Sequence, residues 1–292
     1  MKRGVIHTVR SLFASAAMIV ALTACTGPGA ERLADFELSD EPLTGKYVWH
    51  DLITDDPAAA RRFYGELFGW SFEATVHPNG GDYTLIRHGD GYLGGIVELP
   101  DPDGADYSRW LGYLSVADVD RAVALTREQG GRAVAGPLEL GDVGRAAAIE
   151  DPQGAVVGLL RSRYGDPVDT AQRGRGDIVW NELLAADPAM AAAFYGELAG
   201  LQQVEEQRAG GVYRLLRAQN RDRAGILLRP ADEVRPVWLT HFAVDDIARA
   251  VDRAEQLGGA VLVAPDPDVR DGLFAVITDP SGALLALRQW TP

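Results

Sequence analysis

Alternating hydrophobic and polar positions mark the first strand of the folded region, and a helical pattern follows it. Tyr47 to Ile53 alternates as a half-buried strand would. Asp56-Pro57 then supplies an N-cap and a first-turn proline. The next apolar residues recur at helical spacing and predict a helix with one buried face: Ala60, Phe63, Tyr64 and Leu67.

The pattern continues with strands, one further helix and more strands, separated by Gly-rich turns. The second helix is expected from Asp118 to Gln129, where Gly130-Gly131 ends it. The expected strands are Ser71 to Val76, Tyr83 to His88, Tyr92 to Leu99, Trp110 to Val116, Arg132 to Leu140, Gly144 to Glu150 and Ala155 to Arg161. This order corresponds to two βαβββ units.

The whole pattern occurs twice. "FYGELFGW" begins at Phe63 and "FYGELAGL" at Phe194, an offset of 131 residues. "WLGYLSVADVDRAV" and "WLTHFAVDDIARAV" are 128 residues apart, as are the turns "DPQG" and "DPSG". A duplicated domain explains these offsets, and the period is too long for a solenoid. We interpret the repeated aromatic pair as packing of a helix on its sheet, with a functional role as the alternative.

These motifs, in this order, resemble the vicinal oxygen chelate superfamily of glyoxalases, extradiol dioxygenases and bleomycin-resistance-type binding proteins. The resemblance implies an α+β fold of two tandem modules, residues 46–162 and 177–290, joined by a linker at 163–176. Each module would pair its βαβββ units into a curled, mixed eight-stranded sheet with helices on the convex side. In the enzymes of the family, a divalent metal lies on the concave face.

The resemblance also indicates where metal ligands, usually His, Glu or Gln, would stand. The corresponding positions are Trp49, Glu98, Leu111 and Gly158 in module 1, and Trp180, Leu228, Leu239 and Ala286 in module 2. Only Glu98 could bind a metal, whereas a catalytic site needs about three protein ligands. A register shifted by one residue would add His50, which alternation turns outward. We therefore predict no cofactor and disfavour a divalent metal.

Strand alternation predicts what lines the concave faces instead. The expected ligand-binding residues are Trp49, Asp51, Tyr83, Glu98, Tyr113, Trp180 and Tyr213. Glu182 and His241 are a candidate catalytic acid–base pair. Each of these predicted roles has a structural alternative. The two tryptophans would fill the space of the metal, the acids would pair with Arg87 or Arg217, and His241 would be a satisfied polar residue.

The N-terminal region predicts export. Lys2, Arg3 and Arg10 precede an apolar stretch from Ser11 to Leu22, and "LTAC" ends at Cys25, the only cysteine in the chain. This resembles a bacterial lipoprotein signal at 1–24, with Cys25 lipidated; the alternatives are an ordinary secretory signal and an uncleaved anchor. Residues 25–45 are acidic and Gly/Pro-containing, which predicts a flexible tether.

The net charge of the chain limits the kinds of partner that it can bind. The formal net charge is -14, and an acidic surface repels nucleic acid and anionic lipid headgroups. Membrane association would therefore depend on the lipid on Cys25. A protein of two covalently linked modules is expected as a monomer or a homodimer.

The sequence thus favours an exported, lipid-anchored protein of the bacterial cell envelope that binds a small, partly apolar molecule in a metal-free concave pocket. Whether it is an enzyme stays open. The alternative is a glyoxalase-like lyase or a dioxygenase-like oxidoreductase that uses a displaced metal site or the Glu182–His241 pair. A third possibility is an interaction module whose troughs are filled by its own side chains.

Overall fold

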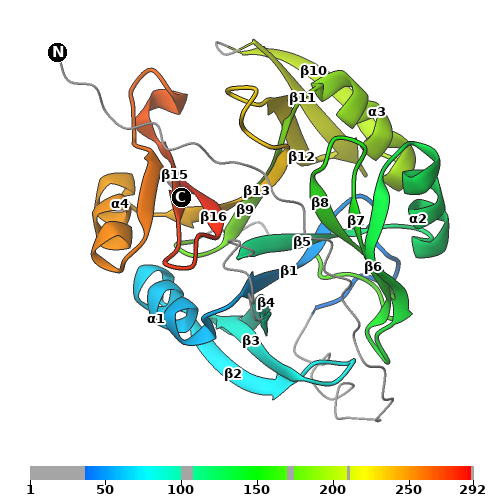
Figure 1. The fold of residues 1–292 in the computed structure, drawn as a ribbon, viewed down its shortest axis with the longest axis horizontal. Coiled ribbons are helices and arrows are strands. Elements are labelled where there is room, and N and C mark those ends of the chain that lie inside the picture. The colour runs from blue at the N-terminus through cyan, green and yellow to red at the C-terminus, as the bar shows by residue number, and fades with distance from the viewer. Residues whose placement is uncertain (1–36, 100–107, 170–173, 209–210, 291–292) are drawn as a thin grey trace.

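A computed structural model describes residues 37–99, 108–169, 174–208 and 211–290, which form two eight-stranded mixed sheets flanked by helices (Figure 1). One sheet has the order β2-β3-β4-β1-β5-β8-β7-β6 and the other β10-β11-β12-β9-β13-β16-β15-β14. Each sheet is built from one copy of the repeat, which confirms the α+β fold of two tandem modules. We call β1 to β8 with α1 and α2 module 1, and the remaining elements module 2.

The elements of module 1 are β1 (Tyr47–Thr54), α1 (Pro57–Phe68), β2 (Ser71–Val76), β3 (Asp82–His88), β4 (Gly91–Glu98), β5 (Arg109–Ser115), α2 (Val119–Glu128), β6 (Arg132–Glu139), β7 (Gly144–Glu150) and β8 (Val156–Ser162). They match the elements expected from the sequence to within one residue at each end.

Module 2 repeats the order with β9 (Ile178–Ala185), α3 (Pro188–Ala199), β10 (Gln202–Arg208), β11 (Gly211–Ala218), β12 (Arg221–Leu228), β13 (Val237–Val244), α4 (Ile247–Gln256), β14 (Ala260–Val263), a 3-10 turn η2 (Arg270–Gly272), β15 (Phe274–Thr278) and β16 (Leu284–Gln289).

The first strand of each βαβββ unit lies in the middle of its sheet. In module 1, β1 pairs in parallel with β4 and antiparallel with β5, and β5 pairs in parallel with β8. Strands β9, β12, β13 and β16 repeat this arrangement in module 2. The two units of a module therefore meet at one antiparallel pair, and alternate residues of those four strands face the surface opposite the helices.

The helices begin and end where the local sequence requires it. The side chain of Asp56 accepts a hydrogen bond from the Ala59 amide at the start of α1, and Gly69 ends the helix with φ 80°. Asp187 and Gly200 do the same for α3. The repeated Asp-Pro start and glycine stop thus fix the length of the "FYGEL" helix in both copies.

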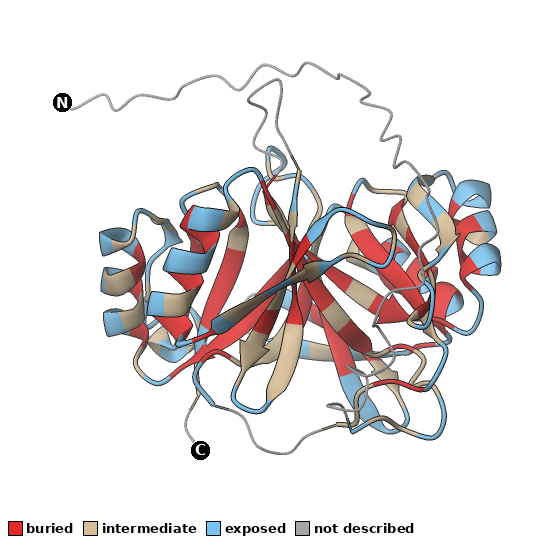
Figure 2. Cartoon of the chain, turned by 90° about the horizontal axis from the view of Figure 1, so that it is seen from below, coloured by how far each residue is buried: buried red, intermediate tan, exposed pale blue. Residues whose placement is uncertain are grey.

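The helix-side cores are shared between the modules. One core combines Phe63 and Tyr64 of α1 with Phe242 and Leu285 of module 2, and the other combines α2 with α3. Figure 1 shows α1 beside α4 and α2 beside α3, while Figure 2 shows buried strands in the middle and exposed outer helix faces. Each module therefore buries its helices only with the help of the other.

A chain of hydrogen bonds crosses from one module to the other inside each core. Trp110 Nε1 donates to the Tyr64 hydroxyl over 2.9 Å, and that hydroxyl donates to Asp279 Oδ2 over 3.0 Å. Asp279 also accepts the Ser281 and Ala283 amides of the "DPSG" turn. The second copy repeats the chain, with Trp238 donating to Tyr195 at 2.8 Å and Tyr195 to Asp151 at 2.9 Å. In both copies, the "FYGEL" helix and the "DP-G" turn of the other copy are thus joined by the same reciprocal contact.

The pseudo-twofold relating the modules passes between two residues at equivalent repeat positions. His50 corresponds to Asn181 at the 131-residue offset, and the two side chains are hydrogen-bonded at 2.9 Å between Nε2 and Oδ1. His50 was expected to point outward, but it is only 4% exposed because module 2 covers that face of β1. Burial lowers the pKa of His50 to about 4, against a smaller opposing effect of Asn181, so it is neutral at pH 7.

The segment predicted as a tether is fixed from residue 37 onward. The Ser39 amide donates to the Asp166 carbonyl over 2.8 Å, and the Leu43 amide donates to Asp166 Oδ2 over 2.6 Å. Asp166 is buried and also accepts the Ser115 and Ser162 hydroxyls. Residues 37–45, the end of the predicted tether, therefore contact the folded part of the chain, and the flexibility of the tether stays a prediction. The predicted signal and Cys25 lie outside the described residues.

Among the described helices, none has the length and apolar character needed to cross a membrane.

Replacing Tyr64 by Phe removes the hydroxyl that joins Trp110 to Asp279 while keeping the ring. We expect Tyr64→Phe to lower the free energy of unfolding by about 1–3 kcal/mol, because buried polar partners on both sides lose a hydrogen bond. Urea denaturation measures the effect, and Tyr195→Phe should cause a similar loss. Tyr164→Phe is the control, since Tyr164 is 54% exposed. An unchanged urea midpoint for both core variants would contradict the role of the inter-module chain.

Candidate ligand-binding site

Each sheet has a concave face opposite its helices, which we call trough 1 in module 1 and trough 2 in module 2. Leu52 of β1 and Leu183 of β9 pack into the helix-side cores. Alternation therefore places Trp49 and Asp51 in trough 1. By the same argument Trp180 and Glu182 lie in trough 2.

Trough 1 is closed over a buried carboxylate. Asp51 is 3% exposed, and its Oδ1 accepts Trp49 Nε1 at 2.9 Å and the Tyr83 hydroxyl at 2.6 Å. Tyr113 of β5 pairs in register with Trp49 and lies near the same carboxylate. Burial raises the pKa of Asp51, and the hydrogen bond from Tyr83 opposes the shift. Asp51 thus obtains its hydrogen bonds from aromatic residues of its own module.

Two glycines make room for the rings over Asp51. A Cβ at Gly95 would lie 1.9 Å from the Tyr83 hydroxyl oxygen, and one at Gly158 would lie 2.5 Å from the Tyr113 ring. Gly158 stands at a position that the family resemblance assigns to a metal ligand. Here the neighbouring tyrosine occupies the space that a side chain at this position would need.

Trough 2 has the same aromatic residues but a different electrostatic character. The Tyr213 hydroxyl donates to Glu182 Oε1 over 2.6 Å and accepts Trp180 Nε1 at 2.9 Å. Arg270 Nη2 donates to both Glu182 oxygens, at 2.6 and 2.8 Å. Burial by itself raises the pKa of Glu182, but His241, Arg270 and Tyr213 together lower it to about 2. Glu182, which is 1% exposed, is therefore an anion at neutral pH.

His241 is the unusual group of trough 2. It is fully buried against Phe274, with ring centroids 5.6 Å apart, and neither ring nitrogen has a hydrogen-bond partner among the described residues. Its Nε2 lies 3.5 Å from Glu182 Oε2, but burial lowers the pKa of His241, so at neutral pH this is a contact of a neutral ring with a carboxylate. A buried imidazole with two unsatisfied nitrogens is costly and requires an explanation.

The residues of the troughs do not fit a divalent metal. Leu111 and Gly158 in module 1, and Leu239 and Ala286 in module 2, have no donor atoms. Glu98 is exposed at the end of β4, and alternation places it with Ile96 of the helix-side core, away from Asp51. Among the described residues no three His, Cys, Asp or Glu side chains gather as a metal site would require.

The structure brings together Glu182 and His241, as the sequence suggested, and it groups Trp49, Asp51, Tyr83 and Tyr113 as expected. It does not pair the acids with the arginines proposed as partners. Arg217 binds Asp222 at 2.7 Å, and Arg87 donates to the Gly89 carbonyl. The partner of Glu182 is Arg270, which comes from η2, 88 residues further along the chain. No local sequence pattern links the two positions, so this pairing could not be predicted.

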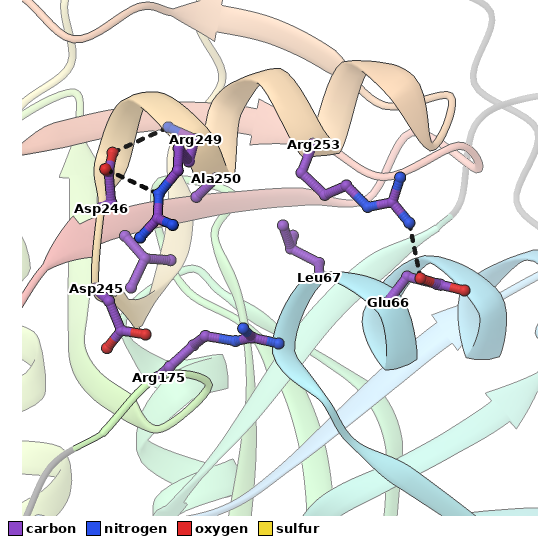
Figure 3. Close-up of a pocket in the computed structure, with 9 residues that line it drawn as sticks. Glu66, Leu67, Arg175, Asp245, Asp246, Arg249, Ala250 and Arg253 are labelled. Carbon is purple, nitrogen blue, oxygen red and sulfur yellow. Dashed lines mark hydrogen bonds and ion pairs between the residues drawn. The ribbon is translucent and has the colours of Figure 1, made fainter.

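A hollow on the helix side lies between α1 and α4 (Figure 3). Its volume is about 280 Å³, and its charged groups are largely paired with one another. Arg253 binds Glu66 at 2.7 Å, and Arg249 binds Asp246 at 2.9 Å. A smaller hollow of about 50 Å³ adjoins Phe194. Neither opens into a trough.

Comparison with known proteins identifies a matching family and several relatives of this chain. Residues 46–159 and 177–287 match the family described as the Glyoxalase/Bleomycin resistance protein/Dioxygenase superfamily. The putative glyoxylase CFP32 of Mycobacterium tuberculosis (strain CDC 1551 / Oshkosh) is 35% identical over 248 residues, covering 84% of this chain and 94% of the relative. The anthracycline biosynthesis protein DauV of Streptomyces sp. (strain C5) is 30% identical over 265 residues, covering 85% and 95%.

Two solved structures share the fold at low sequence identity. The Mn(II)-bound glyoxalase from Novosphingobium aromaticivorans has a TM-score of 0.56 and 16% identity, covering 84% of this chain and 82% of that one. The 2,2',3-trihydroxybiphenyl 1,2-dioxygenase from Sphingomonas wittichii strain RW1 has a TM-score of 0.56 and 14% identity, covering 85% and 91%.

Neutral isosteres at the two acids should have different effects. Asp51→Asn keeps an acceptor for Trp49 and Tyr83 and removes a charge that burial disfavours, so we expect a change of less than about 1 kcal/mol at pH 7. Glu182→Gln removes the charge that balances Arg270, and we expect a loss of about 1–3 kcal/mol. Chemical denaturation of both variants measures the difference.

The pH dependence provides a second check on the same variants. The folded-state pKa of Glu182 is lowered from 4.5 to about 2, so its stabilisation is present above pH 4.5 and is lost as the pH falls towards 2. The deficit of Glu182→Gln should therefore shrink over that interval. Equal effects of the two substitutions at pH 7 would contradict the assigned difference between the troughs.

Proposed function

The chain belongs to the glyoxalase/bleomycin resistance protein/dioxygenase superfamily, and we propose that it binds a small, partly apolar molecule in trough 2 without a metal ion. The observation that carries this proposal is His241. A buried imidazole whose two nitrogens lack partners among the described residues offers one donor and one acceptor to a ligand. Glu182 and Tyr213, hydrogen-bonded to each other, stand beside it and hold the floor of the trough in place.

Trough 1 is the weaker candidate for a ligand-binding site because its own residues already hydrogen-bond to its buried carboxylate. Asp51 Oδ1 already accepts hydrogen bonds from Trp49 and Tyr83, and among the described residues of trough 1 no buried, unpartnered nitrogen corresponds to those of His241. At the 128-residue offset, Tyr113 stands where module 2 has His241. We propose that module 1 supports the fold while module 2 binds the ligand. The sequence-based expectation of ligand contacts at Asp51 and Tyr83 would then not apply.

The relatives support a small organic molecule as the ligand. One is named a putative glyoxylase and another an anthracycline biosynthesis protein, and each name refers to chemistry on small molecules. The walls of trough 2 suit such a molecule, since Trp180, Leu239 and Phe274 supply apolar surface beside the polar groups.

An enzyme is the second candidate, and one distance favours it. Glu182 Oε2 lies 3.5 Å from His241 Nε2, so the neutral imidazole could accept a proton from a substrate while the carboxylate stabilises the charge that develops. Glu182 itself is a poor base because its pKa is about 2. A His241→Ala variant that kept the turnover of the wild-type protein, measured on methylglyoxal and a thiol, would eliminate this candidate.

The absence of suitable donors predicts that the protein does not retain a transition metal. After incubation with Mn²⁺, Fe²⁺, Ni²⁺ or Zn²⁺ and dialysis, we expect far less than one bound ion per chain by mass spectrometry of the metal content, because too few ligands converge. His241→Ala should give the same background. Retention of one ion per chain in the wild-type protein alone would instead indicate a metal site built on His241.

We propose further that the protein is exported and anchored by lipid on Cys25. The basic segment, the apolar stretch and "LTAC" follow one another in the order of a bacterial lipoprotein signal, which supports this proposal. Bacteria expressing the full chain should incorporate labelled palmitate into it, and Cys25→Ser should abolish the label and shift the protein from the detergent phase to the aqueous phase. A labelled Cys25→Ser protein would refute lipidation at this residue.

A further inference from the structure

We infer that the ligand of trough 2 is a small organic anion, with its charged group bound by Arg270 and Arg288 and an apolar body against Phe274 and Trp180. This rests on the proposed function and adds the chemical class of the ligand. It follows from the distribution of arginines around the trough and from a comparison of the two modules with each other.

Arg270 uses only part of its guanidinium group on Glu182. Nη2 makes both hydrogen bonds to that carboxylate, while Nε and Nη1 have no partner among the described residues. The side chain is 31% exposed, and its guanidinium carbon lies 4.6 Å from the centroid of the Phe274 ring. Arg270 is thus held in position by Glu182 and Phe274, and its Nε and Nη1 groups are each left to donate a single charge-assisted hydrogen bond to an anion.

The backbone around Arg270 is itself unusual. Arg270 and Asp271 both adopt left-handed conformations, with φ of 51° and 58°, which residues other than glycine seldom take. Such conformations cost free energy and persist where the surroundings over-determine them. In η2 they direct Arg270 across the trough to Glu182, so the loop holds a cation over the concave face at a local cost.

Arg288 supplies a second cation on the same face. It alternates with Ala286 along β16, pairs in register with Phe274 of β15, and makes no ion pair with any described residue. Its charge reaches His241 and contributes to the lowered pKa of that residue. Glu182 therefore pairs with Arg270, and Arg288 adds a cation that has no ion-pair partner among the described residues.

Module 1 provides an internal comparison. At the 128-residue offset, Arg270 corresponds to Asp142 and Arg288 to Leu160, so the cations are specific to module 2. Leu160 packs with Val48 and Ala146 in a small core instead. The net charge of the chain is -14, so an arginine with free donors and a second, unpaired arginine in one trough would bind an anion there against the general repulsion of the acidic surface.

Three probes with one ring system separate the charge of the ligand from its apolar surface. We would titrate 2-naphthoate, 2-naphthamide and 2-naphthylmethylamine into the wild-type protein by isothermal titration calorimetry. We expect 2-naphthoate to bind once per chain and about fivefold to tenfold more tightly than the amide, because a charge-assisted hydrogen bond exceeds a neutral one. The amine should bind more weakly than the amide.

Two arginine variants test which residues produce the preference for the anionic probe. Arg288→Gln should lower the affinity for 2-naphthoate by about fivefold to tenfold and leave the amide unchanged, since Arg288 is exposed and anchors no described residue. Arg121→Gln, an exposed position on α2, is the matched control and should change neither affinity. Arg270→Gln should remove the remaining preference, and its circular dichroism spectrum checks that it folds.

The outcomes distinguish the two levels of the proposal. Equal affinity for all three probes would overturn the anionic class and leave binding in trough 2 standing. A preference for 2-naphthoate that survives both Arg288→Gln and Arg270→Gln would place the anion elsewhere and overturn the assignment to these residues. Failure of every probe to bind at millimolar concentration would count against the proposed function itself.

Discussion

A tyrosine in the helix of each repeat donates a hydrogen bond to an aspartate in the last turn of the other repeat, and the molecule depends on this exchange. Tyr64 reaches Asp279, and Tyr195 reaches Asp151, each inside an apolar core made by both modules. The aspartates in turn hold the amides of their own hairpin turns, so one carboxylate fixes a local turn and a long-range contact together. Neither module could bury its helices alone without exposing this polar chain.

Because the cores lie on the helix side, the concave faces are free to diverge. Both keep a tryptophan, an acid and a tyrosine at matching positions, yet the acids have opposite surroundings. Asp51 is held by neutral aromatic donors, and burial raises its pKa. Glu182 is held by Arg270, and its pKa falls to about 2. A single duplication thus produced one trough that is closed by its own rings and one that retains a charged, unsatisfied group at His241.

The site was predictable from the sequence only as far as strand alternation reaches. Alternation placed Trp49 with Asp51, and Trp180 with Glu182, and the structure confirms both pairs. The family resemblance put Glu98 on the concave face, but its side chain lies on the helix side with Ile96, and alternation did not show that a second module covers His50. Arg270 was missed because a loop conformation with positive φ, invisible in a hydrophobic pattern, brings it to Glu182.

The sequence by itself determined the fold class, the duplication and the limits of nearly every strand and helix, because periodicity, caps and turn residues act over a few neighbouring positions. Only the tertiary structure decided which residues meet across the pseudo-twofold, which acid has a cationic partner and which histidine has none. Those outcomes depend on contacts between residues about 90 to 215 positions apart, such as Arg270 with Glu182 and Tyr64 with Asp279. Hydrogen bonding and desolvation at such contacts depend on which residues are close in three dimensions. Local sequence patterns do not contain that information.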